Sequence, residues 1–476
     1  MNEREYIQYD AVDLAGLLAS GQVTPVELME CAIRLASSVG AMYNAICLPE
    51  YDAARSFARQ WKQTGPFSGI PFLLKDSGLP SRRLKSNIGS NLFAGIEHEI
   101  DATLCQRFET AGLLAFARTT VPELCMAPTT EAKANGGPTL NPYDRTRSSG
   151  GSSGGAAVAV AAGIVPVAHA SDGGGSIRIP ASCCGVFGLK SSRGRIPMGP
   201  LRGEGWGGLA TDGVLSRTVR DTATALDAVG GYEPGAPYAS PVGAPLTGFV
   251  LRPFDRPLRI KVWRDPLTAV ELAPECVGAL EKATQLFASL GHVVESARAP
   301  AELQYERFVA AHTRVLAANL ALTVDGRLAV QKRALTSDDL EEAMLDGYEV
   351  GQAITAKQYA ADIATFHSIG RALDRCFVDC DLILTSTLTR PAAPHGELAM
   401  RGSFVDFRES VARYSTHLAI VNASGQPAAN LPLHWTEAGL PVGVQVIAPF
   451  GREDLLVQFA SQVEATGVWQ PSVLKP

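Results

Sequence analysis

Glycine and serine crowd one stretch in the middle of the chain, and this stretch constrains the fold most. Ten of the 46 glycines lie between Gly136 and Gly175, and glycine is kept where the backbone takes unusual dihedrals or approaches a ligand closely. Residues 150–155 read GGSSGG, and three glycines precede Ser176. Such a cluster alone is more often a turn or a linker. A functional interpretation of it therefore depends on the other motifs in the chain.

The segment between the two serine clusters predicts that the chain returns to one edge of a sheet. Residues 156–162 are small and apolar, as in a buried helix, and residues 164–168 resemble a strand. A loop, helix, strand and loop in this order bring Ser176 back to the edge that holds Ser152. Pro180 predicts a helix that starts just after it. Converging amides near a helix N-terminus are what an oxyanion needs.

A serine nucleophile needs a base, and the sequence offers two kinds. His169 lies seven residues before Ser176 on a strand-like run, which favours a buried structural histidine. Lys75 ends the apolar run at residues 70–74, which predicts a stem in the core and an amine at the sheet edge. Burial disfavours the charged form of lysine. Since this stretch alone favours an exposed lysine at a strand end, the choice of base depends on other motifs.

The rest of the chain predicts an α/β fold in one domain, residues 1–476. Residues 24–27 (TPVE) form a capping box with proline at the first helical position, which indicates an amphipathic opening helix. Short apolar strands then alternate with helix-sized segments and glycine-rich turns, as around a central sheet. Within the domain we expect a core at about 65–235, a helical cover at about 300–375, and strands and a helix at 380–470.

Several separated motifs resemble the amidase signature family of serine hydrolases, in the same order along the chain. They are GIPFLLKD from Gly69, GGSSGG from Gly150, DGGGSIRIP from Asp172 and GVFGLK from Gly185. Asn141-Pro142, NASGQP from Asn422 and GLPVGVQ from Gly439 extend the resemblance. It covers most of the chain and is weakest across residues 240–375.

The resemblance implies a central, mostly mixed sheet covered by helices on both faces, and a triad of serine, cis-serine and lysine. By position, Ser176 is the nucleophile, Ser152 the bridging serine after a cis Gly151-Ser152 bond, and Lys75 the base. The implied oxyanion hole comprises the amides of Gly173, Gly174, Gly175 and Ser176. The implied reaction is hydrolysis of a carboxylic amide through an acyl-serine, with Ser152 relaying the proton to Lys75.

Two departures from the family pattern concern the surroundings of the triad. Ser191-Ser192 stand where the family usually has Pro-Thr, and Gly173 stands where a larger residue is more frequent. Residues 194–200 and 204–206 resemble the branch that includes hydrolases of nylon-type cyclic amide oligomers and aryl or aliphatic amidases. We expect an apolar or bulky amide substrate, cyclic, oligomeric or aryl. Candidate substrate-binding residues are Cys125, Met126 and Trp206, with core packing an equal alternative for Met126.

Other functions remain open at this stage. A nucleophile elbow centred on Ser152 or Ser153 would indicate an α/β-hydrolase with a downstream histidine (His395, His417 or His434), but it leaves Lys75 unexplained. An amidotransferase A subunit shares the motifs and works with partner subunits. An esterase or carbamate hydrolase would use the same triad. A silent binding protein is disfavoured because all three triad positions are intact. Asp172 and Arg178 are expected to pair in a structural role.

The composition of the chain argues against some classes of binding partner. The 42 basic and 48 acidic residues give a net charge of -6 without long runs of either sign, which leaves no footprint for nucleic acid or an anionic membrane. Nine unevenly spaced cysteines indicate reduced thiols, and Cys376 and Cys380 with His367 fit a helix face better than a metal cluster. Residues 1–10 resemble neither a signal peptide nor an anchor. We expect a cytoplasmic enzyme without cofactor or metal that uses a small amide and water, and a homodimer stays open.

Overall fold

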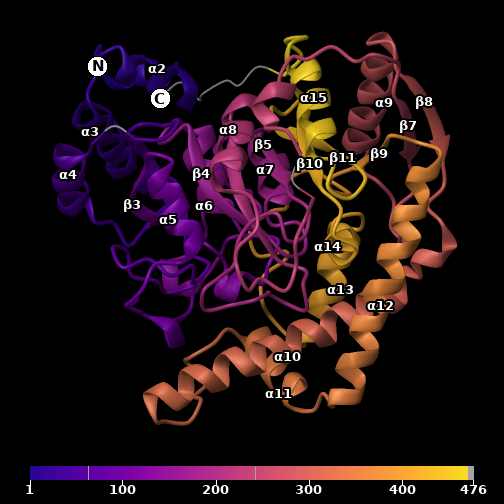
Figure 1. The fold of residues 1–476 in the computed structure, drawn as a ribbon. Helices are drawn as coiled ribbons and strands as arrows, with labels where there is room; N and C mark the ends of the chain where they lie inside the picture. Colours follow the sequence, from indigo (N-terminus) through magenta and orange to yellow (C-terminus); the bar gives the residue numbers. More distant parts are fainter. Residues whose placement is uncertain (63, 242, 470–476) are drawn as a thin grey trace.

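Two neighbouring β-sheets form the centre of the structure, a computed structural model that describes residues 1–62, 64–241 and 243–469 (Figure 1). The larger sheet has eight strands in the order β4-β6-β5-β10-β11-β9-β7-β8. Its strands are β4 (Val167–Asp172), β5 (Phe187–Lys190), β6 (Thr211–Ser216), β7 (Arg259–Trp263), β8 (Val293–Ala297), β9 (Leu382–Ser386), β10 (Ala428–Trp435) and β11 (Pro441–Ile447). The sheet is mixed, because β7 runs parallel to β8 and β9 while the other neighbours are antiparallel.

The smaller sheet extends this centre towards the N-terminal part of the chain. It contains β1 (Ile46–Cys47), β2 (Ile70–Lys75) and β3 (Leu113–Thr119) in the order β1-β3-β2. Strand β2 lies beside β4, and the Lys75 N–H donates to His169 Nδ1 over 3.2 Å. The side chain of a β4 residue therefore connects the two sheets at the end of β2.

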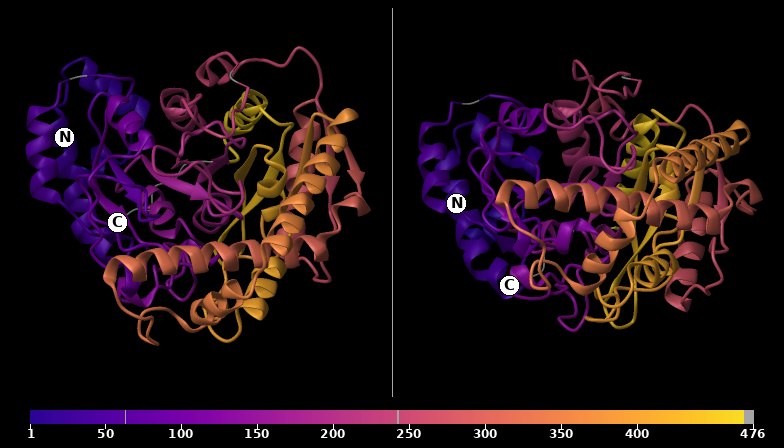
Figure 2. Two further views of the ribbon diagram at one scale, coloured as in Figure 1. Left: turned by 60° about the horizontal axis from the view of Figure 1, so that its bottom comes forward. Right: turned by 90° about the horizontal axis from the view of Figure 1, so that it is seen from below.

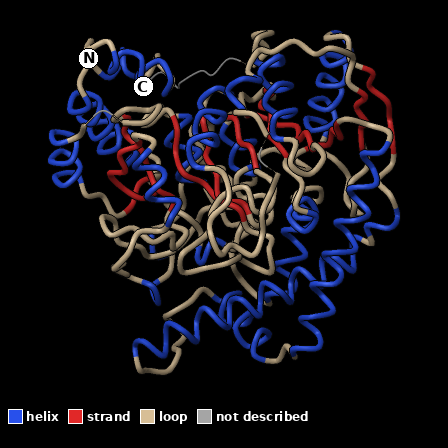
Figure 3. The backbone as a smooth tube through the Cα atoms, in the orientation of Figure 1, coloured by secondary structure: helices blue, strands red, loops and turns tan. Residues whose placement is uncertain are grey.

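Helices surround both sheets, as Figure 3 shows in blue around the red strands. They are α1 (Glu3–Tyr6), α2 (Ala11–Ala19), α3 (Pro25–Leu35), α4 (Tyr51–Gln60), α5 (Thr103–Thr110), α6 (Gly154–Ala161), α7 (Arg178–Cys184), α8 (Val219–Val229), α9 (Pro274–Ser289), α10 (Tyr305–Gln331), α11 (Glu342–Gln352), α12 (Ala356–Arg375), α13 (Phe404–Tyr414), α14 (Ala419–Ser424) and α15 (Glu453–Glu464). The predicted α/β fold with a mixed sheet flanked by helices is confirmed. None of the helices in the described part of the chain is long and apolar enough to cross a membrane.

The opening helix begins as its sequence predicts. In α3 the Thr24 N–H donates to Glu27 Oε2 over 2.8 Å, and the Glu27 N–H donates to Thr24 Oγ1 over 3.3 Å. These two bonds form the capping box, and Pro25 takes the first helical position, where a missing N–H costs nothing. Its apolar face packs in the core that also buries β2.

The segment that carries both serine clusters folds largely as expected. Helix α6 is buried along its whole length, because glycine, alanine and valine leave room for neighbours on every side. The following strand starts at Val167, later than the strand-like run 164–168 suggests. Helix α7 starts at Arg178 and not after Pro180, which lies in the first turn and so needs no hydrogen-bond partner for its nitrogen.

Three helices lie in the segment 300–375, for which we expect a helical cover. Helix α10 packs against both α11 and α12, and the three helices extend along one side of the molecule, in orange in Figures 1 and 2. An apolar cluster ties this cover to the loops near the N-terminal sheet. It combines Phe93, Leu124 and Met126 with Leu316 and Leu320 of α10 and Phe404 and Phe407 of α13.

Candidate active site

Lys75 ends β2 with its amine inside the protein. The residue is fully buried, and its Nζ donates to Ser152 Oγ over 2.7 Å, to Ser171 Oγ over 2.8 Å and to the Ser171 carbonyl over 3.2 Å. Burial lowers the pKa of Lys75 below its ordinary value, although Cys125, Asp212 and Asp172 oppose this shift. The amine is thus held by hydroxyl and carbonyl oxygens, which also accept hydrogen bonds from a neutral amine.

The backbone around Ser152 is fixed by close packing. The Gly151-Ser152 peptide bond is cis, as the family resemblance implies. A Cβ on Gly151 would lie 2.5 Å from the Thr129 carbonyl oxygen, and one on Gly155 would lie 2.5 Å from the Ala45 oxygen. Only glycine fits at either position. The glycine pairs therefore allow neighbouring backbone segments to approach closely. This packing fixes the position of Ser152.

Ser171, one residue before the DGGGSIRIP motif, is a further residue at the Lys75 amine that the sequence motifs do not include. Both its hydroxyl and its carbonyl bind the Lys75 amine. Its carbonyl also accepts from Ser153 Oγ over 3.3 Å, and Ser153 Oγ accepts from the Ser171 N–H over 3.4 Å. This exchange ties the start of α6 to β4. In the sequence, the only feature that could have indicated this role of Ser171 was its position inside a strand, before the glycine triplet.

Ser176 lies at the end of the glycine loop between β4 and α7, with 8% of its surface exposed. Its hydroxyl forms no hydrogen bond to another described residue, and the structure joins Lys75 to Ser152 but not Ser152 to Ser176 by such a bond. In enzymes without bound substrate, catalytic hydrogen bonds are often long and tighten only in the complex.

Asp172 determines how the glycine loop turns. The Gly175 N–H donates to Asp172 Oδ1 over 2.7 Å, and the Ile177 N–H donates to Oδ2 over 3.1 Å. The Gly175 amide is therefore already occupied. The amides of Gly173, Gly174 and Ser176 donate to no other described residue, so three of the four amides expected in the oxyanion hole remain free for it.

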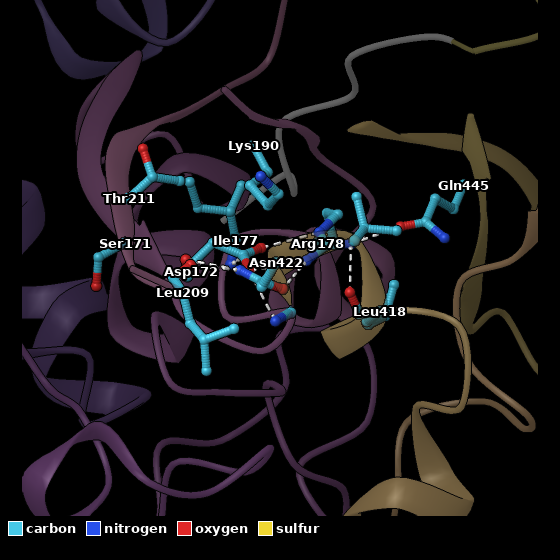
Figure 4. A network of polar contacts seen from close by, with 12 residues as sticks. Ser171, Asp172, Ile177, Arg178, Lys190, Leu209, Thr211, Leu418, Asn422 and Gln445 are labelled. Atoms are coloured by element: carbon cyan, nitrogen blue, oxygen red, sulfur yellow. Dashed lines mark hydrogen bonds and ion pairs between the residues drawn. The ribbon is translucent and has the colours of Figure 1, made fainter. Parts of the chain in front are cut away.

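Arg178 holds Asp172 in place, in the network that Figure 4 shows. Its Nε and Nη2 donate to the Asp172 carboxylate over 2.9 and 2.8 Å, so the expected pair forms. Arg178 also donates to Gln445 Oε1 over 2.6 Å and to Asn422 Oδ1 over 2.7 Å. The arginine charge lowers the pKa of Asp172 far below its usual range, against the effect of burial. The two C-terminal motifs thus converge on Arg178, which holds the carboxylate that orients the glycine loop.

Trp206 explains one departure from the family pattern. A Cβ on Gly173 would lie 2.5 Å from Cε3 and Cζ3 of the Trp206 ring. The ring therefore occupies the space that a larger residue at position 173 would need. Trp206 itself has a φ of 56° in the left-handed region. The structure thus brings this predicted substrate-binding residue against the glycine loop.

The other two predicted substrate-binding residues, Cys125 and Met126, follow one another in a loop after β3. Burial raises the pKa of the Cys125 thiol, and the charge of Lys75 opposes this shift. Met126 is 4% exposed and belongs to the apolar cluster under the helical cover. Core packing, the alternative considered for Met126, is what the structure shows for most of its side chain.

Three of the histidines bind groups other than the candidate serines. His169 is fully buried, accepts from the Lys75 N–H, and places Nε2 3.0 Å from Asp212 Oδ1, so it is the structural histidine that the sequence favours. His417 Nε2 lies 3.1 Å from the Asp265 carbonyl, and His434 Nδ1 lies 3.1 Å from Lys282 Nζ. The α/β-hydrolase interpretation needs a histidine base, and these two bind elsewhere.

Comparison with known proteins gives the same family. Residues 27–457 match the amidase family. The chain is 35% identical over 483 residues to a 6-aminohexanoate-cyclic-dimer hydrolase of Paenarthrobacter ureafaciens, covering 98% of this chain and 97% of that protein. It is 32% identical over 469 residues to the putative amidase AmiC of Mycobacterium tuberculosis (strain ATCC 25618 / H37Rv), covering 97% and 95%.

Solved structures agree with the sequence relatives. A 6-aminohexanoate cyclic dimer hydrolase complexed with substrate has a TM-score of 0.91 at 33% identity, with 98% of this chain and 100% of that chain covered. A bacterial aryl acylamidase of the amidase signature family has a TM-score of 0.87 at 24% identity, with 98% and 99% covered, and shows the shared fold. The chain therefore belongs to the amidase signature family, whose members hydrolyse amides.

Proposed function

We propose that this amidase cleaves the C–N bond of carboxylic amides through a covalent acyl-Ser176 intermediate, with Ser152 as proton relay and Lys75 as base. The observation that carries the proposal is the 2.7 Å contact between Lys75 Nζ and Ser152 Oγ in a fully buried position. A buried lysine loses its proton more easily than a solvated one. A neutral amine bound to a serine hydroxyl is poised to take that hydroxyl's proton.

The acylation step follows from this arrangement. Ser176 Oγ attacks the amide carbonyl and gives its proton to Ser152, and Ser152 gives its own proton to Lys75, which becomes ammonium. Lys75 then returns one proton to Ser152 while Ser152 gives one to the amide nitrogen, so that the C–N bond breaks, a neutral amine leaves, and Lys75 is neutral again. Water then attacks the ester with the same relay and releases the carboxylic acid and free Ser176.

The oxyanion of each tetrahedral intermediate needs donors, and we assign them to three amides. The N–H groups of Gly173, Gly174 and Ser176 have no described partner, while Gly175 is engaged by Asp172. Fixed backbone donors stabilise developing charge without reorganising during the reaction. The Asp172–Arg178 pair holds the loop in this form before substrate arrives.

For the substrate, we propose an amide with an apolar, multi-carbon acyl or amine part. Trp206 lies over the glycine loop, and Met126 belongs to the apolar wall below the helical cover. Relatives that match over 98% of the chain hydrolyse a 6-aminohexanoate cyclic dimer.

The nine free thiols are typical of a reducing compartment, which supports our proposal of a cytoplasmic location.

The test compares two serine variants in hydrolysis of hexananilide. Ser176→Ala removes the nucleophile and should lower kcat by about a thousandfold or more. Ser182→Ala is the matched control, because this buried serine of α7 accepts from the Gly443 N–H of β11 and lies outside the proton path. It should lose about 1 kcal/mol of stability and keep its activity. A Ser176→Ala protein with more than about a hundredth of the wild-type rate would overturn the assignment.

A further inference from the structure

Arg408 of α13 is a buried cation without a counter-ion. It is 7% exposed, and its Nη1 donates to the Met126 carbonyl over 3.0 Å. Its Nε is buried and forms no hydrogen bond, and no carboxylate in the described part of the chain forms an ion pair with it. Burial lowers the pKa of Arg408 to about 10, so the side chain still carries its charge at neutral pH. Buried charges are normally paired, because an unpaired one is costly.

His312 of α10 is a second polar group in the same region. It is 5% exposed, stacks on Phe308 with 5.4 Å between ring centroids, and its Nε2 is buried without a hydrogen bond. Its Cε1 lies 3.6 Å from the point where a Cβ on Gly174 would stand. Burial, and then the charge of Arg408, holds the pKa of His312 well below its ordinary value. The ring is therefore neutral and adds no second charge.

Both residues border the proposed catalytic groups. Gly174 belongs to the glycine loop, so His312 of the helical cover lies against this loop. Arg408 is anchored on the carbonyl of Met126, the residue that follows Cys125, and Cys125 lies close enough to Lys75 for the lysine charge to act on its thiol. Apolar Trp206 and Phe407 belong to the same surroundings. One wall of the site thus combines apolar surface with a single unpaired charge.

We propose that Arg408 and His312 form a subsite that binds a carboxylate at the far end of an amide substrate. The proposal rests on the hydrolytic function proposed above and narrows its substrate class. A guanidinium and a carboxylate fit each other through paired hydrogen bonds and opposite charge, and the neutral imidazole can donate one more. The substrates expected are linear amides in which an apolar chain separates the scissile bond from a free carboxylate.

The first test uses the wild-type enzyme and two matched pairs of amides. One pair carries the end group on the amine side, 6-(hexanoylamino)hexanoate against 6-(hexanoylamino)hexan-1-ol. The other pair carries it on the acyl side, the N-hexyl monoamide of adipic acid against N-hexyl-6-hydroxyhexanamide. In at least one pair the carboxylate should have a KM about tenfold lower or more, the size of a charge-assisted hydrogen bond. Equal KM values within both pairs would overturn the subsite.

The second test asks whether Arg408 causes the preference. In Arg408→Gln the ratio of the two KM values should fall towards one, whereas Arg408→Lys, which keeps the charge, should retain part of it. Arg413→Gln is the matched control, since this exposed arginine of the same helix pairs with Glu409, and its ratio should equal that of the wild type. A purely structural Arg408 would alter both amides of a pair alike and leave the ratio intact, which contradicts the proposal.

Binding to a non-hydrolysing protein separates this subsite from the catalytic proposal. Calorimetry on Ser176→Ala should show tighter binding of the carboxylate than of the alcohol in the pair that discriminates, and Arg408→Gln in that background should remove the difference. If the wild type hydrolyses none of the four amides while this difference persists, the proposed reaction fails and the subsite stands. If hydrolysis proceeds and the binding difference is absent, the subsite fails alone.

Discussion

Lys75 shows how burial can give an ordinary residue a chemical role. Its stem lies in the apolar end of β2, and its amine meets only hydroxyl and carbonyl groups as hydrogen-bond partners. The sequence placed this lysine at the end of a strand, and the family motif was needed to prefer it to an exposed one. Ser171, which binds the same amine, could not be singled out because nothing in its local sequence distinguishes it from a serine at a strand end.

The pH dependence of kcat/KM should show that Lys75 acts as the base. Because burial lowers the pKa of this lysine, the neutral base forms as pH rises through that pKa, and activity should rise with it. The rise should be complete below the free-lysine pKa of about 10.4. Lys75→Arg keeps the charge and should be inactive at every pH, whereas Lys282→Arg, on a partly exposed residue beside His434, should keep the wild-type profile. A flat profile or an active Lys75→Arg enzyme would show that another group takes the proton.

Gly173 and Trp206 should behave as a coupled pair. In Gly173→Ala the new methyl group meets the Trp206 ring at 2.5 Å, so the loop or the ring must move, and kcat/KM should fall by about a hundredfold. Trp206→Leu in the same chain makes room and should restore part of the loss. Gly16→Ala is the control, because nothing lies within 4 Å of its Cβ position. Strictly additive effects in this double-mutant cycle would mean that the two residues do not interact.

At the scale of elements, the sequence predicted those with a strong periodic or apolar signal. The capping box of α3, the buried α6 and strand β11 follow from capping residues, small side chains and a run of alternating valines. Strand β8 was not predicted, and its residues are exposed or half-buried, so its sequence lacks the apolar signal on which such predictions depend. Helix α7 starts two residues before Pro180 because Arg178 binds Asp172 there.

Asp172 should hold the loop and α7 together. Asp172→Asn leaves Arg178 buried with a neutral partner, and breaking a buried pair costs about 3–5 kcal/mol. Since the native pKa of Asp172 is depressed, the wild-type advantage should be present above the unfolded aspartate pKa of about 3.9 and disappear as pH falls below it. Urea unfolding followed by circular dichroism measures both effects. Glu409→Gln breaks an exposed pair with Arg413 and should cost less than about 1 kcal/mol; a similar cost for both variants would contradict the role of Asp172.

At the scale of the whole molecule, distant segments meet at one site. Strands β9, β10 and β11 lie between β5 and β7, so late parts of the chain complete a sheet begun much earlier. The motifs around Asn422 and Gln445 were visible in the sequence, but their role at Arg178 depends on this topology. His312 and Arg408 come from the region of weakest resemblance and from a later helix, and no local pattern connects them with Gly174 or Met126. The division into core, cover and C-terminal part stays a prediction.

The central claim is that Ser176 carries the acyl group, and rapid acid quench followed by mass spectrometry tests it most directly. With hexananilide in excess, the protein should gain one hexanoyl group during the first turnover, and digestion should place it on the peptide segment that contains Ser176. Ser176→Ala should gain none, while Ser182→Ala should gain the same group as the wild type. Aniline release with no acylated protein at any quench time, or an acyl group on Ser152 or Ser153, would contradict the account.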